Sequence, residues 1–380
     1  MPYVIAPGPL RGRRPSYAGR WQAARLSPLA LTVVIAAFAF STPREIALSR
    51  LLPVAPALAA AMWPVIPTLL LGAGCLLIMI SLSFFYADLG TQYTSAAIVL
   101  VTLAAAYASH VRRQREEVLF HIRLVADAAQ KVLLRPVPCR IEGVEIESLY
   151  LAAQEQARIG GDFYEAADTP YGIRLLIGDV RGKGLSAVGA ASAVISCFRE
   201  AAYDEPDVTG IIHRLETSIC RYSAAFPGQD LPERFATAII AEIPPTGHLM
   251  RLLNCGHPPP LLVRDREVHV LEPSQPSPPL NLAPLIGDHY VIDTAAFSPG
   301  DQLLLYTDGV TETRDRAGEF FPLTDWLRRQ EPMRPRELLD RLHRDLVRYS
   351  GGRLSDDVAA LALRSSEDAA EQTADGGRGL

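Results

Sequence analysis

The chain has 380 residues and a net charge of −5, so it has room for more than one domain and lacks the basic excess of a general nucleic-acid binder. Its five cysteines are scattered without CxxC spacing, which indicates neither a zinc knuckle nor a disulfide framework and fits a reducing, cytosolic location. Residues 51–111 carry one charged side chain, Asp88, whereas the chain beyond residue 112 is densely charged. We therefore predict a membrane part followed by a catalytic part in the cytoplasm, with no nucleic-acid partner.

Four apolar runs follow a basic N-terminus (1–26) and predict a transmembrane region over 27–111. They cover residues 26–40, 46–62, 64–86 and 94–111. A crossing helix needs about 20 apolar residues. The third run meets that length, the fourth nearly does, and the first two are short, the second being weakened by Arg50 and two prolines. Arginines flank both ends of the region, which predicts that both ends are cytoplasmic and that the number of crossings is even. We favour four crossings over two, in a multi-pass protein of the plasma membrane that contacts lipid. Buried core helices are the less favoured alternative.

A linker helix is predicted over 112–136, where Pro136 ends an amphipathic pattern. Its apolar positions step by four and three residues and form a heptad seam: Val118, Ile122, Val125, Ala129 and Val132. Two interpretations stay open. The helix either packs on its own domain or joins two protomers in a homodimer. In both cases it leads directly from the last crossing to the domain behind it, and is the expected path for a signal.

Short strand-like runs dominate residues 137–364. Helical stretches at 184–203, 207–224, 323–330 and 335–350 lie between them. This interleaving predicts an α+β domain in which sheets pack together with helices outside. The Pro- and Ser-rich residues 272–287 are predicted as a surface loop, and the polar tail 365–380 as disordered.

Aspartates stand at the ends of several apolar strands of this domain. Asp179 closes "RLLIGD", Asp308 closes "LLLYTDG", Asp356 and Asp357 precede "VAALALR", and Asp162 follows "IGG". A carboxylate at a buried strand end is costly unless it is paired or bound to a cation. Oxygen ligands without His or Cys suit Mg²⁺ or Mn²⁺ rather than zinc. Two such ions could hold a water between them, lower its pKa and clamp a phosphoryl group, which predicts hydrolysis of a phosphate ester.

The motifs "ARIGGDFYE", "LLIGDVRGKGLSA", "FATAII…LLNCGHPPPLL", "GDQLLLYTDGVTETRD" and "LSDDVAALALR" resemble, in this order, those of the PPM-type (protein phosphatase 2C-like) serine/threonine phosphatases. The match is to the bacterial branch typified by the stage II sporulation protein E phosphatase, and covers about residues 125–364. The resemblance implies an αββα sandwich with two metal ions between its sheets, and hydrolysis of phosphoserine or phosphothreonine. It also implies a phosphorylated regulatory protein as substrate, an anti-sigma-factor antagonist being the expected kind.

The same resemblance assigns roles to individual residues. Asp179 would bridge two Mn²⁺ or Mg²⁺ ions, with the Val180 carbonyl as a further ligand. Asp162 would hold one ion directly or through water. Asp308 and Asp356 would complete the second ion, with Asp357 as the alternative to Asp356.

Three features depart from the family pattern. Arg181 stands where eukaryotic relatives place a His general acid, so it is a candidate for stabilising charge while a metal-bound water supplies the proton. The phosphate-binding arginine of those relatives has no certain match, and Arg158, Arg181 and Lys183 are the candidates. Asn281 replaces a usual glycine, and we expect Asn to adopt the left-handed backbone there.

Other interpretations are weaker. "GGDF" also occurs in diguanylate cyclases, but Phe163 occupies the place of their second acid, and the later aspartates would be idle. A membrane-anchored pseudophosphatase that only binds partners is the main alternative function. His257 in "GHPPP" is expected to form a structural corner rather than to act in catalysis.

Overall fold

The computed structural model describes residues 26–41, 48–83, 89–152, 160–225, 235–245 and 248–365. The chain divides into two compact units, residues 1–119 and 120–380. Each unit has its own core, as expected for segments of such different composition. Residues 1–25 of the predicted basic N-terminus and 366–380 of the predicted polar tail lie outside the described residues, as does Arg158, whereas Ser365 ends a strand.

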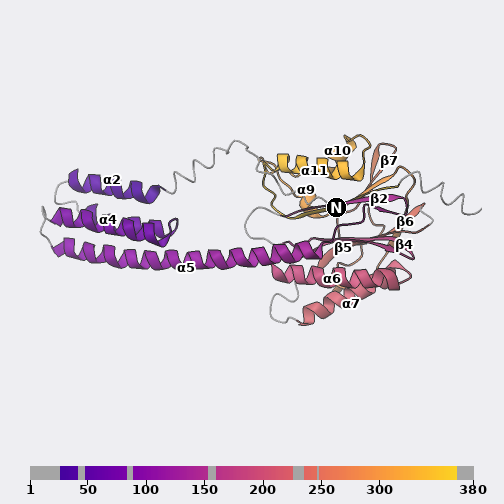
Figure 1. The fold of residues 1–380 in the computed structure, drawn as a ribbon, viewed down its shortest axis with the longest axis horizontal. Coiled ribbons are helices and arrows are strands. Elements are labelled where there is room, and N and C mark those ends of the chain that lie inside the picture. Colours follow the sequence, from indigo (N-terminus) through magenta and orange to yellow (C-terminus); the bar gives the residue numbers. More distant parts are fainter. Residues whose placement is uncertain are drawn as a thin grey trace, which may run out of the picture. The chain divides into compact units, whose positions relative to one another are not determined.

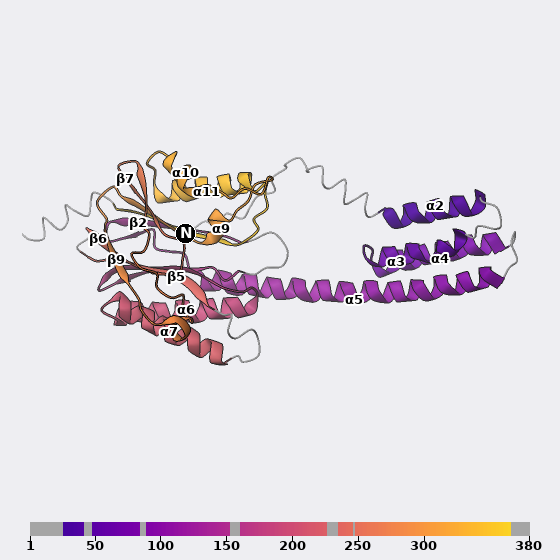
Figure 2. The same ribbon diagram turned by 180° about the vertical axis from the view of Figure 1, so that it is seen from behind.

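The first unit is built from apolar helices (Figures 1 and 2). They are α2 (Ser27–Ser41), the short 3-10 helix η1 (Leu48–Leu51), α3 (Val54–Ala60), α4 (Val65–Ser83) and the start of α5 (Leu89–Leu133). Cys75 and Met79 of α4 lie in a small buried cluster, while Leu70 and Leu77 on the same helix are 67% and 64% exposed. A helix that is apolar on all faces is typical of a membrane span.

Two helices of this unit are long and apolar enough to cross a membrane: α4 and the segment Thr91–His121 of α5. Helix α2 and residues 48–60 are shorter. The second apolar run of the sequence is divided into η1 and the seven-residue α3. Pro53 precedes α3 and Pro56 lies in its first turn. Proline lacks the N–H that a continuous helix needs, which explains the division.

The second unit contains two antiparallel sheets. The six-stranded sheet, here called sheet A, has the order β1-β2-β11-β10-β7-β8, and the five-stranded sheet B has the order β3-β4-β5-β6-β9. The strands of sheet A are β1 (Arg140–Ile141), β2 (Val144–Leu151), β7 (Leu261–Arg264), β8 (Glu267–Val270), β10 (Gln302–Tyr306) and β11 (Val358–Ser365). Those of sheet B are β3 (Phe163–Thr169), β4 (Gly172–Val180), β5 (Ala236–Ile243), β6 (Leu249–Cys255) and β9 (Ile292–Ala296).

Helices cover the outer faces of both sheets (Figures 1 and 2). Helix α6 (Leu185–Asp204) packs on β3 and β4, and α7 (Val208–Ala225) packs on α6. On the other side, α11 (Pro335–Tyr349) packs on β2 and β11, next to α10 (Leu323–Arg328). Two short helices, α8 (Ala283–Ile286) and α9 (Asp308–Thr311), lie in connections. The predicted α+β class and αββα sandwich are therefore confirmed.

Helix α6 also meets the length and composition of a membrane span. Its Val194, Ile195 and Phe198 are fully buried against the sandwich, so this apolar face belongs to the core. The same composition that suits lipid also suits a helix enclosed between a sheet and a second helix.

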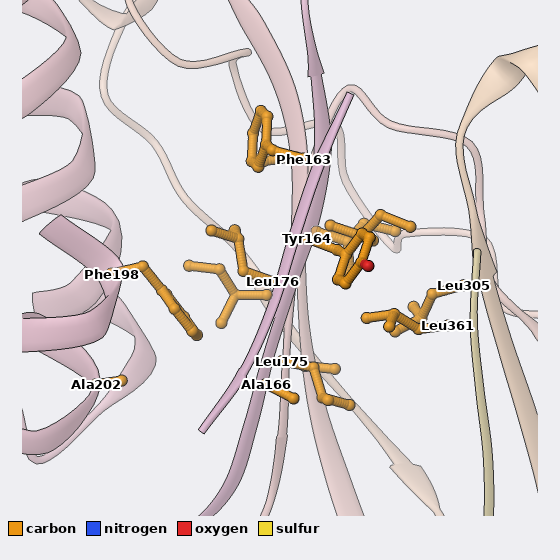
Figure 3. Packing of buried hydrophobic residues seen from close by; sticks show 14 of the residues in the cluster. Phe163, Tyr164, Ala166, Leu175, Leu176, Phe198, Ala202, Leu305 and Leu361 are labelled. Carbon is orange, nitrogen blue, oxygen red and sulfur yellow. The ribbon is translucent and has the colours of Figure 1, made fainter. Parts of the chain in front are cut away.

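The core between the sheets is formed by alternating side chains of the inner strands (Figure 3). Tyr164 points toward Leu305 and Leu361 of sheet A, whereas Leu176 points toward Phe198 of α6. Because both faces of β4 are buried, this strand is apolar almost throughout, which is the pattern of a strand covered on two sides.

The end of α5 is fixed to the sandwich by hydrogen bonds and by Leu133, which packs against the core. Arg199 donates to the Leu133 carbonyl (3.0 Å), and the Gln130 side chain donates to the Gly160 carbonyl (3.5 Å). The predicted seam lies elsewhere: Val125 and Val132 are 62% and 79% exposed. Of the two interpretations of the linker helix, packing on its own domain is therefore not seen for these two seam residues within the described part of the chain.

Asn281 has φ = 70°, so the expected left-handed backbone at this position is confirmed. Its N–H donates to Glu216 of α7 at 2.7 Å. This bond holds the loop that contains Asn281 against the helix layer.

Candidate metal centre

The predicted acids lie at the same edge of the sandwich. In sheet B, Asp162 immediately precedes β3 and Asp179 is the penultimate residue of β4, and these strands pair with Phe163 opposite Gly178. In sheet A, Asp308 follows β10 and Asp356 precedes β11, and these strands pair with Tyr306 opposite Ala360. In an antiparallel pair, the start of one strand lies beside the end of its neighbour. The strand ends that carry the acids therefore meet.

Two side-chain contacts connect the sheets at this edge. The Thr307 hydroxyl donates to Asp162 Oδ2 at 2.7 Å. Lys183, in the loop after β4, forms an ion pair with Asp356, with Nζ 3.2 Å from Oδ2. The acids of the two sheets thus lie within a few side-chain lengths of one another.

The glycines beside the acids are required because neighbouring segments approach their Cα atoms too closely for a side chain. A Cβ added at Gly160 would lie 2.1 Å from Asp357 Oδ2, and one at Gly161 would lie 2.4 Å from the Val180 carbonyl oxygen. A Cβ at Gly309 would lie 1.8 Å from the Asp357 carbonyl oxygen. Any larger residue would push the acid-bearing segments apart, which explains the flanking "GG" and "DG" pairs.

Burial and mutual repulsion raise the pKa of these carboxyl groups. Burial raises the pKa of Asp162 well above its ordinary value, and the charge of Asp179 raises it further, against the hydrogen bond from Thr307. Burial raises the pKa of Asp179 to about 7, with Asp308 adding to the shift and a hydrogen bond with Asp162 opposing it. Burial also raises the pKa of Asp308, helped by Glu312 and Asp356. Such shifts mark acids that lack a compensating positive charge.

Asp356 and Asp357 have different surroundings. Asp357 is 3% exposed and its Oδ2 accepts a short hydrogen bond from the Tyr150 hydroxyl. Asp356 is more exposed, and both its carboxylate oxygens face the Lys183 ammonium. Asp357 is thus held inside the sandwich, whereas Asp356 faces the open edge.

Two further residues considered from the sequence, Arg181 and His257, make other contacts. Arg181 is exposed, and its guanidinium carbon lies 5.3 Å from the centre of the Phe235 ring. His257 is buried, its Nδ1 is 3.0 Å from the Thr237 hydroxyl, and burial lowers its pKa to about 3. A buried, neutral imidazole fits the structural corner expected of "GHPPP".

The donor set fits a hard divalent cation. The donors are carboxylates and a backbone carbonyl, and uncompensated buried acids gain most from a cation. Among the described residues, no three His, Cys, Asp or Glu side chains form a ready-made metal-binding group. Asp356 contacts Lys183, and Asp357 contacts Tyr150. The prediction of metal ligands therefore rests on which residues lie at this edge and not on a fully formed coordination site.

Sequence reasoning missed Thr307 and Tyr150, the two hydroxyl donors to the buried acids. Thr307 stands directly before Asp308 at the end of an apolar strand, which was a usable signal. Tyr150 lies in β2, far from any acid in the sequence, and only its pairing with β11 brings it to Asp357.

Comparison with known proteins identifies the family. The model of the family described as stage II sporulation protein E (SpoIIE) matches residues 169–366, just over half of the chain. The chain belongs to this family. The predicted resemblance is thereby confirmed, and the chain is a member of the SpoIIE branch of the PPM-type protein serine/threonine phosphatases.

Individual relatives share only low sequence identity with this chain. The phosphoserine phosphatase RsbU of Bacillus subtilis is 24% identical over 277 residues, which cover 70% of this chain and 77% of RsbU. Protein IcfG of Synechocystis sp. is 26% identical over 242 residues, covering 56% of this chain but only 37% of IcfG. The SiaA-PP2C domain of Pseudomonas aeruginosa has a TM-score of 0.51 and 17% identity, and the match covers 67% of this chain and 98% of that domain. The structural similarity to this domain supports the fold described above.

Proposed function

We propose that this SpoIIE-family chain is a membrane-anchored, metal-dependent phosphatase that removes phosphate from phosphoserine or phosphothreonine on a regulatory protein. An anti-sigma-factor antagonist is the proposed kind of substrate. RsbU, a phosphoserine phosphatase in Bacillus subtilis, matches across 70% of the chain, which supports this class of substrate.

The observation that carries the proposal is the convergence of acids from both sheets at one edge, with Asp162 buried and Asp179 half-buried. Asp162 and Asp179 are held together although burial raises the pKa of each. A buried carboxyl group in contact with a half-buried one destabilises a fold unless a cation neutralises their charge. Asp308, which follows a strand of the facing sheet, extends the same cluster through its effect on Asp179.

We propose that Asp162, Asp179, the Val180 carbonyl, Asp308 and Asp356 hold two divalent cations, Mn²⁺ or Mg²⁺. Such a pair supplies an activated water nucleophile and stabilises the charge of a transferring phosphoryl group. We favour Asp356 over Asp357 as the ligand, since Asp357 is engaged by Tyr150 and buried behind Gly160.

Basic residues at the same edge are proposed to bind the phosphate group. Lys183 already faces the acids through its ion pair with Asp356, so its ammonium can reach an anionic substrate there. Arg181 lies in the same loop and would have to turn from the Phe235 ring to join it. Arg158 is retained as a third candidate from its position four residues before Asp162.

The remaining parts are proposed to anchor and regulate the phosphatase. Helix α4 and the segment Thr91–His121 of α5 have the length and composition to cross the membrane, and arginines flank the apolar region. The exposed seam on α5 is proposed to pair with that of a second copy. Signals would then reach the site along α5, whose Gln130 contacts Gly160 two residues before Asp162.

The test of the function uses the full chain in detergent micelles. With Mn²⁺ it should release phosphate from p-nitrophenyl phosphate and from phosphoserine proteins, and a chelator should abolish this activity. Asp179→Asn should lower kcat/KM by more than the roughly 10- to 100-fold loss typical of residues that only support metal ligands. Binding of a phosphorylated partner without hydrolysis under any metal would instead support the pseudophosphatase.

The same assay separates the two candidate ligands of the second ion. Asp356→Asn should raise the Mn²⁺ concentration needed for half-maximal activity, because a charged ligand at the open edge is lost. Asp357→Asn should mainly lower the Tm, because it disturbs a buried hydrogen bond with Tyr150. The opposite result would assign the ligand to Asp357.

A further inference from the structure

Thr307 connects three acid-bearing segments through one hydroxyl group. The residue is fully buried and directly precedes Asp308. Its Oγ lies 2.7 Å from Asp162 Oδ2 in the facing sheet, and it accepts the Ala359 N–H of β11 at 2.9 Å. The segment that carries Asp356 runs directly into β11. One side chain therefore contacts every segment that supplies a predicted ligand, apart from β4.

The direction of the hydrogen bond follows from counting donors and acceptors. A threonine hydroxyl has one hydrogen to give. The Ala359 carbonyl, 3.3 Å from Oγ, already accepts the backbone N–H of Thr307 at 3.0 Å. The Ala359 N–H occupies an acceptor position on Oγ. Asp162 Oδ2 lies 2.7 Å from Oγ and the Ala359 carbonyl oxygen lies 3.3 Å from it, so the hydrogen is directed to the nearer acceptor, Asp162.

The bond fixes the carboxyl group of Asp162, which stands directly before β3. Asp162 follows Gly160 and Gly161, which have no side chains to pack around it. Its Oδ2 is held by Thr307 from the opposite sheet, and the carboxyl group also hydrogen bonds with Asp179. The side chain is thereby oriented toward the other acids.

We propose that Thr307 is a positioning residue that orients Asp162 for divalent-cation binding. The inference rests on the proposed function, since it assumes that Asp162 is a ligand. Residues that hydrogen bond to metal ligands set the orientation of those ligands, and their loss typically weakens metal binding by about 10- to 100-fold. A purely structural link between the sheets would change the Tm but not the affinity of the folded protein for metal.

The experiment is calorimetric titration of Mn²⁺ into the metal-free full chain in detergent. Thr307→Val keeps the shape of the side chain and removes the hydroxyl, and we expect it to raise the Mn²⁺ Kd by about 10- to 100-fold. Thr307→Ser keeps the hydroxyl and should restore most of the affinity. In activity assays, Thr307→Val should require more Mn²⁺ while its KM for substrate at saturating Mn²⁺ stays near the wild-type value.

Thr169→Val is the matched control. Thr169 is a buried threonine at the other end of β3, where its hydroxyl donates to the Gly172 carbonyl at 2.7 Å. The same hydroxyl loss there should lower the Tm and leave the Mn²⁺ Kd unchanged. If Thr307→Val does not fold, Thr307→Cys provides the comparison, because the thiol is a weaker donor of similar size.

The outcomes separate the inference from the function on which it rests. If the wild-type chain binds Mn²⁺ and Thr307→Val or Thr307→Cys binds it equally well, the inference is wrong and the proposed function stands. Equal weakening by Thr307→Ser and Thr307→Val would also overturn it, since the hydroxyl would then be irrelevant. A wild-type chain that binds no Mn²⁺ overturns both.

Discussion

Asp162 and Asp179 are carboxyl side chains that the fold removes from water, although they are more stable when hydrated. Burial raises the pKa of both side chains. The charge of Asp179 adds to the shift at Asp162, and the charge of Asp308 adds to the shift at Asp179, whose pKa reaches about 7. Folding alone does not favour such a pair, because ionised carboxylates are more stable in water. The arrangement is explained if cation binding recovers the free energy that folding loses there.

The raised pKa values predict how the stability of the metal-free protein depends on pH. In the unfolded chain, Asp179 titrates near its ordinary pKa of about 4, whereas in the folded chain it titrates near 7. The folded state therefore binds more protons between these values, and the destabilisation grows as the pH rises from about 4 to 7. Below the ordinary pKa this contribution is absent, and above 7 it is complete.

Asp179→Asn should accordingly stabilise the metal-free chain at about pH 8, by up to about 4 kcal/mol, with the gain shrinking toward pH 5. Thermal unfolding with a chelator present measures this difference. Asp168→Asn, which changes an exposed acid on the same strand β3, is the control and should show no comparable trend. A gain that is independent of pH would show that burial of the charged Asp179 carboxylate is not the cause.

At the scale of elements, α5 combines two kinds of helix in one continuous segment. Its first part, Thr91–His121, is apolar enough for a membrane, and its last residues contact the sandwich through Gln130 and Leu133. Between them, apolar seam residues such as Val125 remain exposed. An exposed apolar seam at heptad spacing is typical of a coiled-coil surface.

Val125→Asp should disrupt the proposed homodimer, because a carboxylate in a seam cannot be buried without a partner. We expect the mass of the protein–detergent particle to fall to that of a single copy, and the turnover to change with it. Light scattering and phosphate release measure the two quantities on the same sample. Ala128→Asp places the same charge outside the seam on an exposed position and should change neither.

A monomeric wild-type chain would remove the basis for this prediction. A monomeric Val125→Asp variant with unchanged turnover would separate dimer formation from regulation of the site. In that case the contact between Gln130 and Gly160 would be structural only.

At the scale of the whole molecule, the composition predicts a catalytic unit on the cytoplasmic side of a membrane. The arginines before and after the apolar region favour the same side for both ends. Under this proposal, helix α4 and the segment Thr91–His121 would form a pair of crossings.

Labelling with a membrane-impermeant maleimide in intact cells tests this orientation. Asp88→Cys should be labelled from outside, while Cys139, which is exposed and follows α5, should react only after permeabilisation. Thr42→Cys decides whether the two shorter runs add a second pair of crossings. The maleimide should label this residue in intact cells if the chain crosses four times, and should not label it if the chain crosses twice. Labelling of Cys139 in intact cells would reverse the proposed topology.

The sequence by itself determined the α+β class, the apolar helices and the strand ends that carry aspartates. These features depend on hydrophobic periodicity, on turn residues and on composition, all of which are local along the chain. The family motifs then linked the aspartates to one site, and the breaks in the second apolar run were visible as prolines.

Only the tertiary structure decided how the site residues are held. The pairing of β10 with β11 places Thr307 beside Ala359, and the packing of the two sheets brings its hydroxyl to Asp162. The exposure of Asp356 and the burial of Asp357, adjacent in sequence, were likewise decided by Lys183 and Tyr150. Such contacts join residues more than 100 positions apart, and local sequence patterns carry no information about which distant side chains will meet.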